Sequence, residues 1–291
     1  MEVVFHLGAP CTDNDLLIQT LLKNRNRLMA EGTSVPPPGR YRAVVRDTAR
    51  ALKGHPASEE IQGALLDAIL DDFDVERLIL SDPRFICINR LVIQRAQIWP
   101  MIDRQTAQLR ALFPEAQVEF FIGMRDPATH IPALFKASRF NNFAEFSENM
   151  QPHAVAWSEM LRRLNMAHPD CPITVWCNED TPLLWGEILR EMAGVGEATS
   201  LEGVDDLVEK IMEPAGFKRM QAYIADHPPE TDWHRRRIVA AFLERYALET
   251  EVEVELDLPG WDEGFIDELS LAYDRDMEEV ARIPGVTLLM P

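Results

Sequence analysis

Short apolar runs alternate with long helical patterns along the 291-residue chain, and this alternation is the feature that most constrains its fold. The runs are rich in β-branched and aromatic residues, which favour strands, and they fall at 3–7, 77–81, 84–88, 118–124, 173–177 and 286–290. Strands that are apolar throughout and separated by helices predict a parallel sheet covered on both faces.

The helical patterns are frequently preceded by Asp, Ser or Thr, which are good N-cap residues. They cover 15–30, 41–53, 58–71, 100–113, 128–138, 153–165, 182–193, 204–213, 217–226, 232–247 and 262–282. The strand signal fades after residue 194. We therefore expect a single α/β domain over 1–291, with an α/β core in 1–194 and a mainly helical extension in 195–291.

Charge and composition narrow the class of protein. With 48 acidic and 29 basic residues the net charge is −19, which repels nucleic acid and anionic membrane surfaces. The N-terminus lacks the basic start and apolar run of a signal peptide, and no stretch reaches about 18 uninterrupted apolar residues, so we expect a cytoplasmic protein without nucleic-acid or membrane partners. The four cysteines show no metal-ligand spacing, so we expect free thiols and no metal.

The first strand runs into the loop "HLGAPCTDND" and then into an apolar helix. In a parallel sheet the first strand-to-helix turn is the usual place for phosphate, because the helix N-terminus presents unpaired N–H groups and a partial positive charge. Gly8 fits this position. The Walker pattern GxxxxGK[ST] is absent, which argues against hydrolysis of ATP or GTP.

The loop and its helix resemble the start of bacterial sulfotransferases, which commonly read H-[IL]-G-x-x-K-T-G-T-T. The matching residues are His6, Gly8, Thr12, Asn24, Arg25, Leu28 and Gly32, and a second block, "GMRDP", matches at Arg125, Asp126 and Pro127. The resemblance implies an α/β fold with a P-loop-type parallel sheet flanked by helices, here with an added C-terminal helical region. It also implies 3′-phosphoadenosine 5′-phosphosulfate (PAPS) as the sulfuryl donor.

The chain departs from the family at the residues that would hold PAPS. The loop lysine of the family falls on Cys11, its Gly-Thr-Thr on Asp13, Asn14 and Asp15, and a later serine on Ala133. A carboxylate about 4 Å from a phosphate would cost roughly 4 kcal/mol per pair of unit charges at an effective dielectric near 20. We therefore expect the aspartates to cap the helix instead.

The candidate cofactor-binding residues follow from the resemblance: Gly8, Cys11, Thr12, Asp13, Asn14, Asp15, Arg125 and Ser138. Arg125 ends an apolar strand and is either an anion ligand or the partner of a carboxylate such as Asp126, which itself is expected to be an N-cap before Pro127. Ser138 and Arg139 are candidates to replace the serine lost at Ala133.

Three residues are candidates for acid and base catalysis, each with a structural alternative. His6 in the first strand has a side chain suited to proton transfer, or it is a buried structural histidine. His130 follows Arg125 on the next helix and is either a base or a solvated side chain. Glu179 ends the strand at 173–177 and is a candidate base, next to Asp180, which is expected to cap the helix that starts near Pro182.

Two groups of arginines stand out in this acidic chain. Arg235, Arg236 and Arg237 point in different directions around a helix, so a solvated, salt-bridging face is the favoured interpretation. Arg40 and Arg42 lie in the proline-rich stretch 33–42, which we expect to be an extended loop. From there they could supply the positive charge that Cys11 cannot.

Two functions are compatible with these observations. The first is transfer of a sulfuryl group from PAPS to a hydroxyl or amine acceptor. The alternative is a degenerate, non-catalytic protein of the same fold that binds a small ligand or a protein partner; a transferase with another donor is a third option. The sequence leaves the acceptor, the catalytic base and the oligomeric state open.

Overall fold

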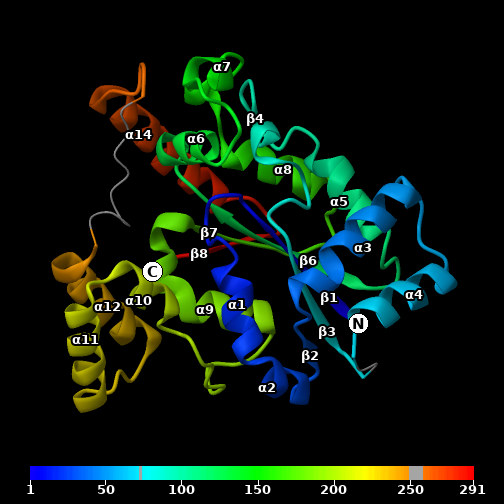
Figure 1. Cartoon of the computed structure of the whole chain (residues 1–291), viewed down its shortest axis with the longest axis horizontal. Helices are drawn as coiled ribbons and strands as arrows, with labels where there is room; N and C mark the ends of the chain where they lie inside the picture. The colour runs from blue at the N-terminus through cyan, green and yellow to red at the C-terminus, as the bar shows by residue number, and fades with distance from the viewer. Residues whose placement is uncertain (72–73, 249–257) are drawn as a thin grey trace.

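The computed structural model describes residues 1–71, 74–248 and 258–291. Its centre is a six-stranded sheet in the order β2-β3-β1-β6-β7-β8, in which every neighbouring pair is parallel (Figure 1). Helices cover the sheet on both faces. The predicted α/β fold, a parallel sheet flanked by helices, is confirmed.

The strands are β1 (Glu2–Gly8), β2 (Thr33–Ser34), β3 (Arg77–Ser81), β6 (Gln117–Met124), β7 (Ile173–Cys177) and β8 (Val286–Leu289). A separate small hairpin is formed by β4 (Ile93–Gln94) and β5 (Gln97–Ile98). Five of the six predicted strands are confirmed. The strand predicted at 84–88 is wrong, because the chain turns at Asp82 and Pro83 after β3, and Phe85 N–H bonds back to the Asp82 carbonyl.

The helices are α1 (Leu16–Lys23), α2 (Arg25–Ala30), α3 (Pro38–Leu52), α4 (Glu59–Ile69), α5 (Ile102–Arg110), α6 (Pro127–Lys136), α7 (Phe143–Ser147), α8 (Trp157–Ala167), α9 (Thr181–Ala193), α10 (Asp206–Ile211), α11 (Pro214–Asp226), α12 (Asp232–Tyr246) and α14 (Glu263–Val280). Single turns of 3-10 helix lie at η1 (Asn89–Leu91), η2 (Pro152–Ala154) and η3 (Asn178–Asp180). The helix predicted over 15–30 is divided at Asn24, whose side chain bonds to the Thr20 and Glu202 carbonyls.

The proline-rich stretch 33–42 is shorter as a loop than the sequence predicts. Extended chain covers β2 and the residues up to Pro37, but Pro38 is already the first residue of α3. Proline suits this position because its fixed φ is helical and its missing N–H would be unpaired there in any case. Arg40 and Arg42 therefore lie on α3 and not in a loop.

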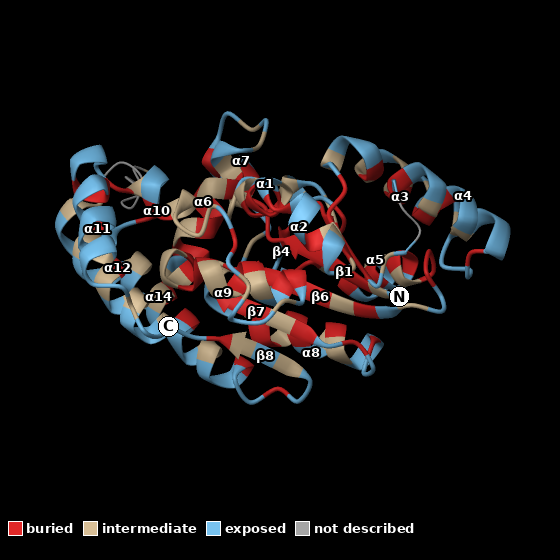
Figure 2. Cartoon of the chain, turned by 90° about the horizontal axis from the view of Figure 1, so that it is seen from below, coloured by how far each residue is buried: buried red, intermediate tan, exposed pale blue. Residues whose placement is uncertain are grey.

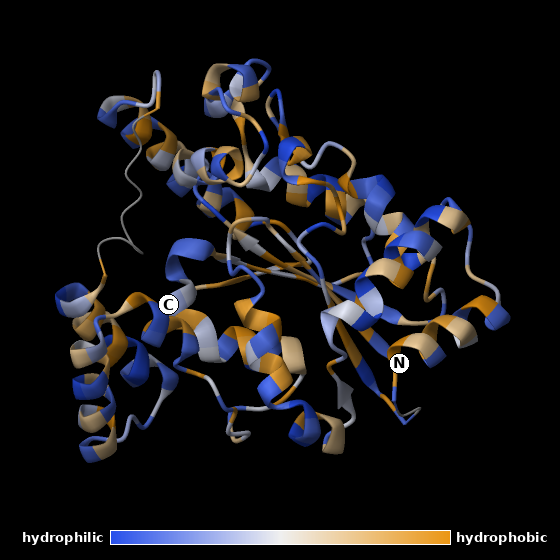
Figure 3. Ribbon diagram, in the orientation of Figure 1, coloured by the Kyte–Doolittle hydropathy of each residue, from blue (hydrophilic) through white to orange (hydrophobic). Residues whose placement is uncertain are grey.

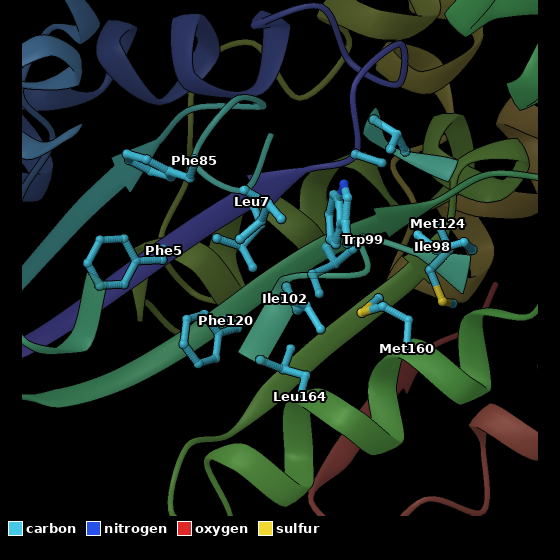
Figure 4. Close-up of a cluster of buried hydrophobic side chains, with 14 of the residues drawn as sticks. Phe5, Leu7, Phe85, Ile98, Trp99, Ile102, Phe120, Met124, Met160 and Leu164 are labelled. Carbon is cyan, nitrogen blue, oxygen red and sulfur yellow. The ribbon is translucent and has the colours of Figure 1, made fainter. Parts of the chain in front are cut away.

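The alternation of side chains along β1 builds a core on each face of the sheet. Phe5 and Leu7 belong to the larger core, which Phe120, Trp99 and residues of α5 and α8 complete (Figure 4). On the other face, Val4 packs with residues of α1 and α9. Buried residues concentrate on the strands, whereas α4, α11 and α12 are exposed along much of their surface (Figure 2). The central strands of the sheet are largely hydrophobic (Figure 3).

The segment 195–291 contains a helical lobe and two elements that rejoin the main body. Helices α10, α11 and α12 share a small core of their own, formed by Val208, Met212, Phe217, Met220 and Val239. After them, α14 packs on α6 and α8, and β8 pairs with β7 as the last strand of the sheet. No helix in the described residues is long and apolar enough to cross a membrane.

Arg77, at the start of β3, joins three strands and one helix. It donates to Glu2 on β1 at 2.5 Å, to Glu119 on β6 at 2.6 Å, and to the Met192 carbonyl at the end of α9. Its side chain is only 10% exposed. A charged group this far from water is stable only when its hydrogen-bonding capacity is fully used.

We expect Arg77→Ala to lower the free energy of unfolding by about 3 kcal/mol, because two carboxylates and a buried carbonyl lose their shared partner. Urea denaturation measures this directly. Arg282→Ala, which removes an arginine from exposed pairs on the surface, should change the same quantity by less than about 1 kcal/mol. Equal costs for the two variants would contradict this role for Arg77.

Candidate functional site

The loop between β1 and α1 lies at the carboxyl edge of the sheet, where β1 and β6 are neighbours. The chain leaves β1 toward β2 and β3 on one side, and it leaves β6 toward β7 on the other. Connections that diverge in this way open a crevice at the carboxyl ends of the strands, where ligands bind in open parallel sheets. Residues 9–15, here called the β1–α1 loop, are therefore the candidate site.

The backbone of this loop is tightly turned. Gly8 has a φ of +94°, and a Cβ at this position would lie 3.1 Å from the backbone of the loop after β3, so only glycine fits. Cys11, Asn14 and Asp15 are also left-handed, with φ of 66°, 50° and 67°. Within the described residues, the backbone N–H groups of 11–15 donate no hydrogen bond. Successive free N–H groups in such turns form a concavity that attracts anions.

The two aspartates of the loop have different roles. Asp13 accepts a hydrogen bond from the Leu17 N–H at 3.1 Å and so caps α1, as predicted. Asp15 occupies the N-cap position without capping the helix, and that part of the prediction is wrong. Its two carboxylate oxygens instead accept hydrogen bonds from Arg42 at 2.7 and 2.9 Å. The hydrogen bond from Arg42 lowers the pKa of Asp15.

Of the two arginines expected to reach the β1–α1 loop, one does. Arg42 reaches the β1–α1 loop from α3, but its charge is neutralised by Asp15. Arg40 does not reach the loop, because it pairs with Asp71 and donates to carbonyls near the end of α4. Among the described residues, the arginine that α3 brings to this loop is thus held in an internal ion pair.

A polar network lies beneath the ion pair. Ser81, the last residue of β3, accepts hydrogen bonds at its carbonyl from Arg42 at 2.9 Å and from the Tyr41 hydroxyl at 2.7 Å. Its own hydroxyl is 2.9 Å from Nδ1 of His6. The other ring nitrogen of this buried histidine has no hydrogen-bond partner in the described part of the chain. Burial lowers the pKa of His6, although Asp13 and Asp15 oppose the effect.

Arg125 holds the backbone of the loop. Its Nη1 donates to the Cys11 carbonyl at 2.6 Å, and its Nε donates to the Thr129 hydroxyl at 3.0 Å. Among the described residues it forms no ion pair within 4.0 Å, so the predicted salt bridge to Asp126 is not made. Burial lowers the pKa of Arg125, and the nearby Glu179 opposes this. The side chain thus ties the end of β6 to the β1–α1 loop.

Two carboxylates at the ends of β6 and β7 are used in hydrogen bonds. Asp126 caps α6 as predicted, because its Oδ1 accepts from the Ala128 N–H at 2.8 Å, and its Oδ2 accepts from Ser270 on α14. Glu179 accepts from the Asp126 N–H at 3.1 Å and from the Tyr273 hydroxyl at 3.3 Å. Burial raises the pKa of Glu179. These contacts fasten α14 to the carboxyl edge of the sheet.

Asp180 lies at the start of α9, where the sequence predicts a cap. The helix begins at Thr181 with Pro182 in its first turn, but the Asp180 side chain makes no capping hydrogen bond. Burial raises its pKa. The predicted position is therefore confirmed and the predicted capping contact is wrong.

His130 is buried, which corrects the interpretation of this residue as a solvated side chain. Its Nε2 donates to the Pro10 carbonyl at 3.0 Å, and its ring stacks on Trp157 with centroids 6.0 Å apart. Because a carbonyl can only accept, Nε2 carries the proton. Burial lowers the pKa of His130 to about 3. A base this weak cannot deprotonate an acceptor hydroxyl near neutral pH.

The remaining candidates make local contacts. The Cys11 thiol donates to the Ala133 carbonyl at 3.6 Å, and burial raises its pKa. Thr12 donates to the Ala9 carbonyl at 2.6 Å, and the Asn14 side chain has no hydrogen-bond partner in the described residues. The Ser138 hydroxyl, just after α6, donates to the Phe135 carbonyl at 2.7 Å, and Arg139 is exposed.

The arginines of α12 stay away from the loop. Arg235 pairs with Asp205, Arg236 pairs with Glu187, and Arg237 lies over the Trp233 ring at 4.8 Å. The prediction of a salt-bridging helix is confirmed. Within the described residues, no group of three or more His, Cys, Asp and Glu side chains could hold a metal ion, and the four cysteines are free.

The sequence does not single out Ser81, Tyr41, Ser270 or Tyr273. Ser81 has one signal, because it is the polar residue that ends a predicted strand at the ligand-binding edge. Tyr41 lies one residue before Arg42 on α3, and only the packing of α3 against β3 brings it to Ser81. Ser270 and Tyr273 come from α14, nearly a hundred residues after Glu179, and carry no sequence signal of this kind.

Similar chains are found among solved structures. No family model matches the sequence, and no curated protein matches it. The chain is similar in structure to a sulfotransferase from Alicyclobacillus acidocaldarius, with a TM-score of 0.40 and 12% sequence identity over 90% of this chain and 98% of that one.

The buried histidine predicts acid sensitivity. The pKa of His130 is lowered in the folded protein. Below about pH 6.5 this side chain therefore binds a proton in the unfolded chain but stays neutral in the folded one. The stability that its neutral form provides is therefore present above pH 6.5 and is lost as the pH falls. Between pH 7 and 5 the expected loss is about 2 kcal/mol.

We expect His130→Phe, which keeps an aromatic ring against Trp157, to remove this part of the pH dependence in urea denaturations at pH 7 and 5. The lowered pKa values of His6 and His168 act in the same direction, so a smaller dependence should persist. His55→Gln, at an exposed position, is the control. An unchanged pH dependence in His130→Phe would show that this histidine is not the group responsible.

Proposed function

We propose that this chain is a sulfotransferase-like protein that binds a small ligand or a protein partner and has lost sulfuryl transfer from PAPS. The observation that carries the proposal is the bidentate ion pair between Arg42 and Asp15 at the β1–α1 loop. A phosphosulfate needs uncompensated positive charge at this loop. Here Arg42, one of the two arginines that contact the loop, is already neutralised by Asp15, and the other, Arg125, is bound to the Cys11 carbonyl.

The charge balance around the loop supports the proposal. The arginines that act on this region, Arg42, Arg84 and Arg125, are set among five carboxylates, those of Asp13, Asp15, Asp82, Asp126 and Glu179. At about 4 Å, a unit charge and a phosphate interact by roughly 4 kcal/mol at an effective dielectric near 20, so the attraction of Arg42 and the repulsion of Asp15 cancel. The residues of the loop therefore do not fit the phosphosulfate group.

The candidate bases support it as well. Sulfuryl transfer to a hydroxyl or amine needs a base that removes the acceptor proton. His130 is buried with a pKa of about 3, and its Nε2 proton is bound to the Pro10 carbonyl. Glu179 is used by the Asp126 N–H and by Tyr273. His6 is enclosed between Ser81 and the Trp176 ring and is 1% exposed.

One observation favours the rival function, sulfuryl transfer from PAPS. The N–H groups of residues 11–15 donate no hydrogen bond within the described part of the chain, and such a concavity suits a phosphate. If Asp15 moved away on binding, Arg42 would join these N–H groups. The two functions therefore differ in whether the wild-type loop binds the nucleotide product, 3′-phosphoadenosine 5′-phosphate.

We expect millimolar 3′-phosphoadenosine 5′-phosphate to leave the thermal unfolding midpoint of the wild-type protein unchanged and to raise that of Asp13→Asn/Asp15→Asn. Asparagine tolerates the left-handed backbone at 15 and can still accept the Leu17 N–H at 13, so the variant removes two negative charges and frees Arg42. At ten times its dissociation constant the nucleotide adds about 1.4 kcal/mol of stability.

Asp71→Asn is the matched control, because it frees Arg40 on the same helix without changing the loop. It should not bind the nucleotide. Stabilisation of the wild-type protein by 3′-phosphoadenosine 5′-phosphate, or its release from PAPS by the wild-type protein, would reject the proposal in favour of the transferase.

A further inference from the structure

A cavity of about 840 Å³ lies between α3, the loop after β3 and α5. These elements pack side by side at one end of the sheet (Figure 1). The volume is in the range of small-molecule sites. None of the lining residues belongs to the β1–α1 loop, so binding in this cavity is independent of the function proposed for that loop.

The charge of the lining is opposite to that of the protein. Acidic residues outnumber basic ones by 48 to 29 in the chain, yet no acidic residue of the described part lines this cavity. Five basic residues do: Arg46, Arg50, Lys53, Arg84 and Arg104. The cavity is therefore a local positive region on an acidic molecule, which concentrates anions there.

Most of these cations lack a close partner. Arg46, Lys53 and Arg104 make no ion pair or hydrogen bond within the described residues. Arg50 and Arg84 have carboxylates only at 3.9 and 3.7 Å. By contrast, Arg42 at the β1–α1 loop and Arg235 and Arg236 on α12 each pair with a carboxylate. The basic groups of the cavity thus remain available to a ligand.

The spacing of the arginines on α3 destabilises this helix. Arg42, Arg46 and Arg50 recur every four residues and so lie along one face of the helix. Like charges at this spacing destabilise a helix. Asp15 neutralises the first of the three, and an anion in the cavity would neutralise the others.

The rest of the lining is apolar. Phe85, Trp99 and Leu109 are buried and contribute to the wall, and Phe85 and Trp99 belong to the main core (Figure 4). Ile88 and Met101 also line the cavity and remain 56% and 43% exposed. Exposed large apolar side chains beside a cavity indicate a surface that a ligand covers. The indole N–H of Trp99 has no hydrogen-bond partner among the described residues.

We propose that this cavity binds a small amphipathic anion, a molecule with a carboxylate, phosphate or sulfate head and an apolar body. The basic side chains of α3 and α5 receive the head, and the apolar body covers Ile88 and Met101 against the wall formed by Phe85 and Trp99. The ligand is a free molecule and not a membrane lipid, because the net charge of −19 repels anionic bilayers.

Decanoate is a suitable probe, measured by isothermal titration calorimetry. We expect the wild-type protein to bind it with a dissociation constant below 1 mM. Decanol, which lacks the anionic head, and acetate, which lacks the apolar body, should each bind at least ten times more weakly. Arg46→Gln/Arg104→Gln should weaken decanoate binding at least tenfold. Ile88→Glu, a change at an exposed position, should also weaken decanoate binding at least tenfold, because it places a negative charge in the apolar part of the lining.

The controls separate this site from general charge effects and from the β1–α1 loop. Arg139→Gln/Arg275→Gln removes the same charge from exposed positions elsewhere and should bind as the wild type does. Asp13→Asn/Asp15→Asn should also bind decanoate normally, whatever its affinity for the nucleotide.

Three outcomes would overturn the proposal: no decanoate binding at 1 mM, equal binding of decanol, or equal binding by Arg46→Gln/Arg104→Gln with an unchanged unfolding midpoint. Sedimentation with phosphatidylglycerol vesicles tests the membrane source. Binding to vesicles without binding to monomeric decanoate would also overturn it.

Discussion

The parallel pairing of β1 with β3 on one side and β6 on the other is the constraint on which the rest of the structure depends. This pairing places His6 opposite Ser81 in register, which is why their side chains meet at the carboxyl edge. It also brings the Cys11 carbonyl within reach of Arg125, the first residue after β6. At the other edge, Arg77 bonds across the same three strands. The sheet thus fixes where the β1–α1 loop begins and which residues of β3 and α6 face it.

The backbone and the side chains of the β1–α1 loop differ in how they would interact with an anion. The turn at Gly8 and the left-handed residues after it keep the backbone form of an anion cradle, with free N–H groups in the described part of the chain. The side chains act in the opposite direction, because Asp13 caps α1 and Asp15 holds Arg42. Backbone and side chains therefore favour different ligands.

The elements are easier to predict from the sequence than their contacts. Strands such as 118–124 and 173–177 are evident because an apolar, β-branched run is a local property. The run 84–88 has the same composition but forms no strand, since the turn at Asp82 and Pro83 ends β3. In the candidate site, the capping role of Asp13 is predicted correctly, because a cap depends on neighbouring residues. The burial of His130 is not, because tertiary packing alone sets that face of α6 against the Pro10 carbonyl.

Helix α3 connects the two regions of positive charge. Pro38 starts the helix at a point that sets the direction of every later side chain, and one face then carries Arg42, Arg46 and Arg50. Arg42 forms an ion pair with Asp15 of the β1–α1 loop, 27 residues away in the sequence. Arg46 and Arg50 instead line the cavity beside α5. The same row of arginines is thus neutralised within the protein at one end and left for an external anion at the other. Positive charge is thus neutralised at the β1–α1 loop and remains available one to two helical turns further along α3.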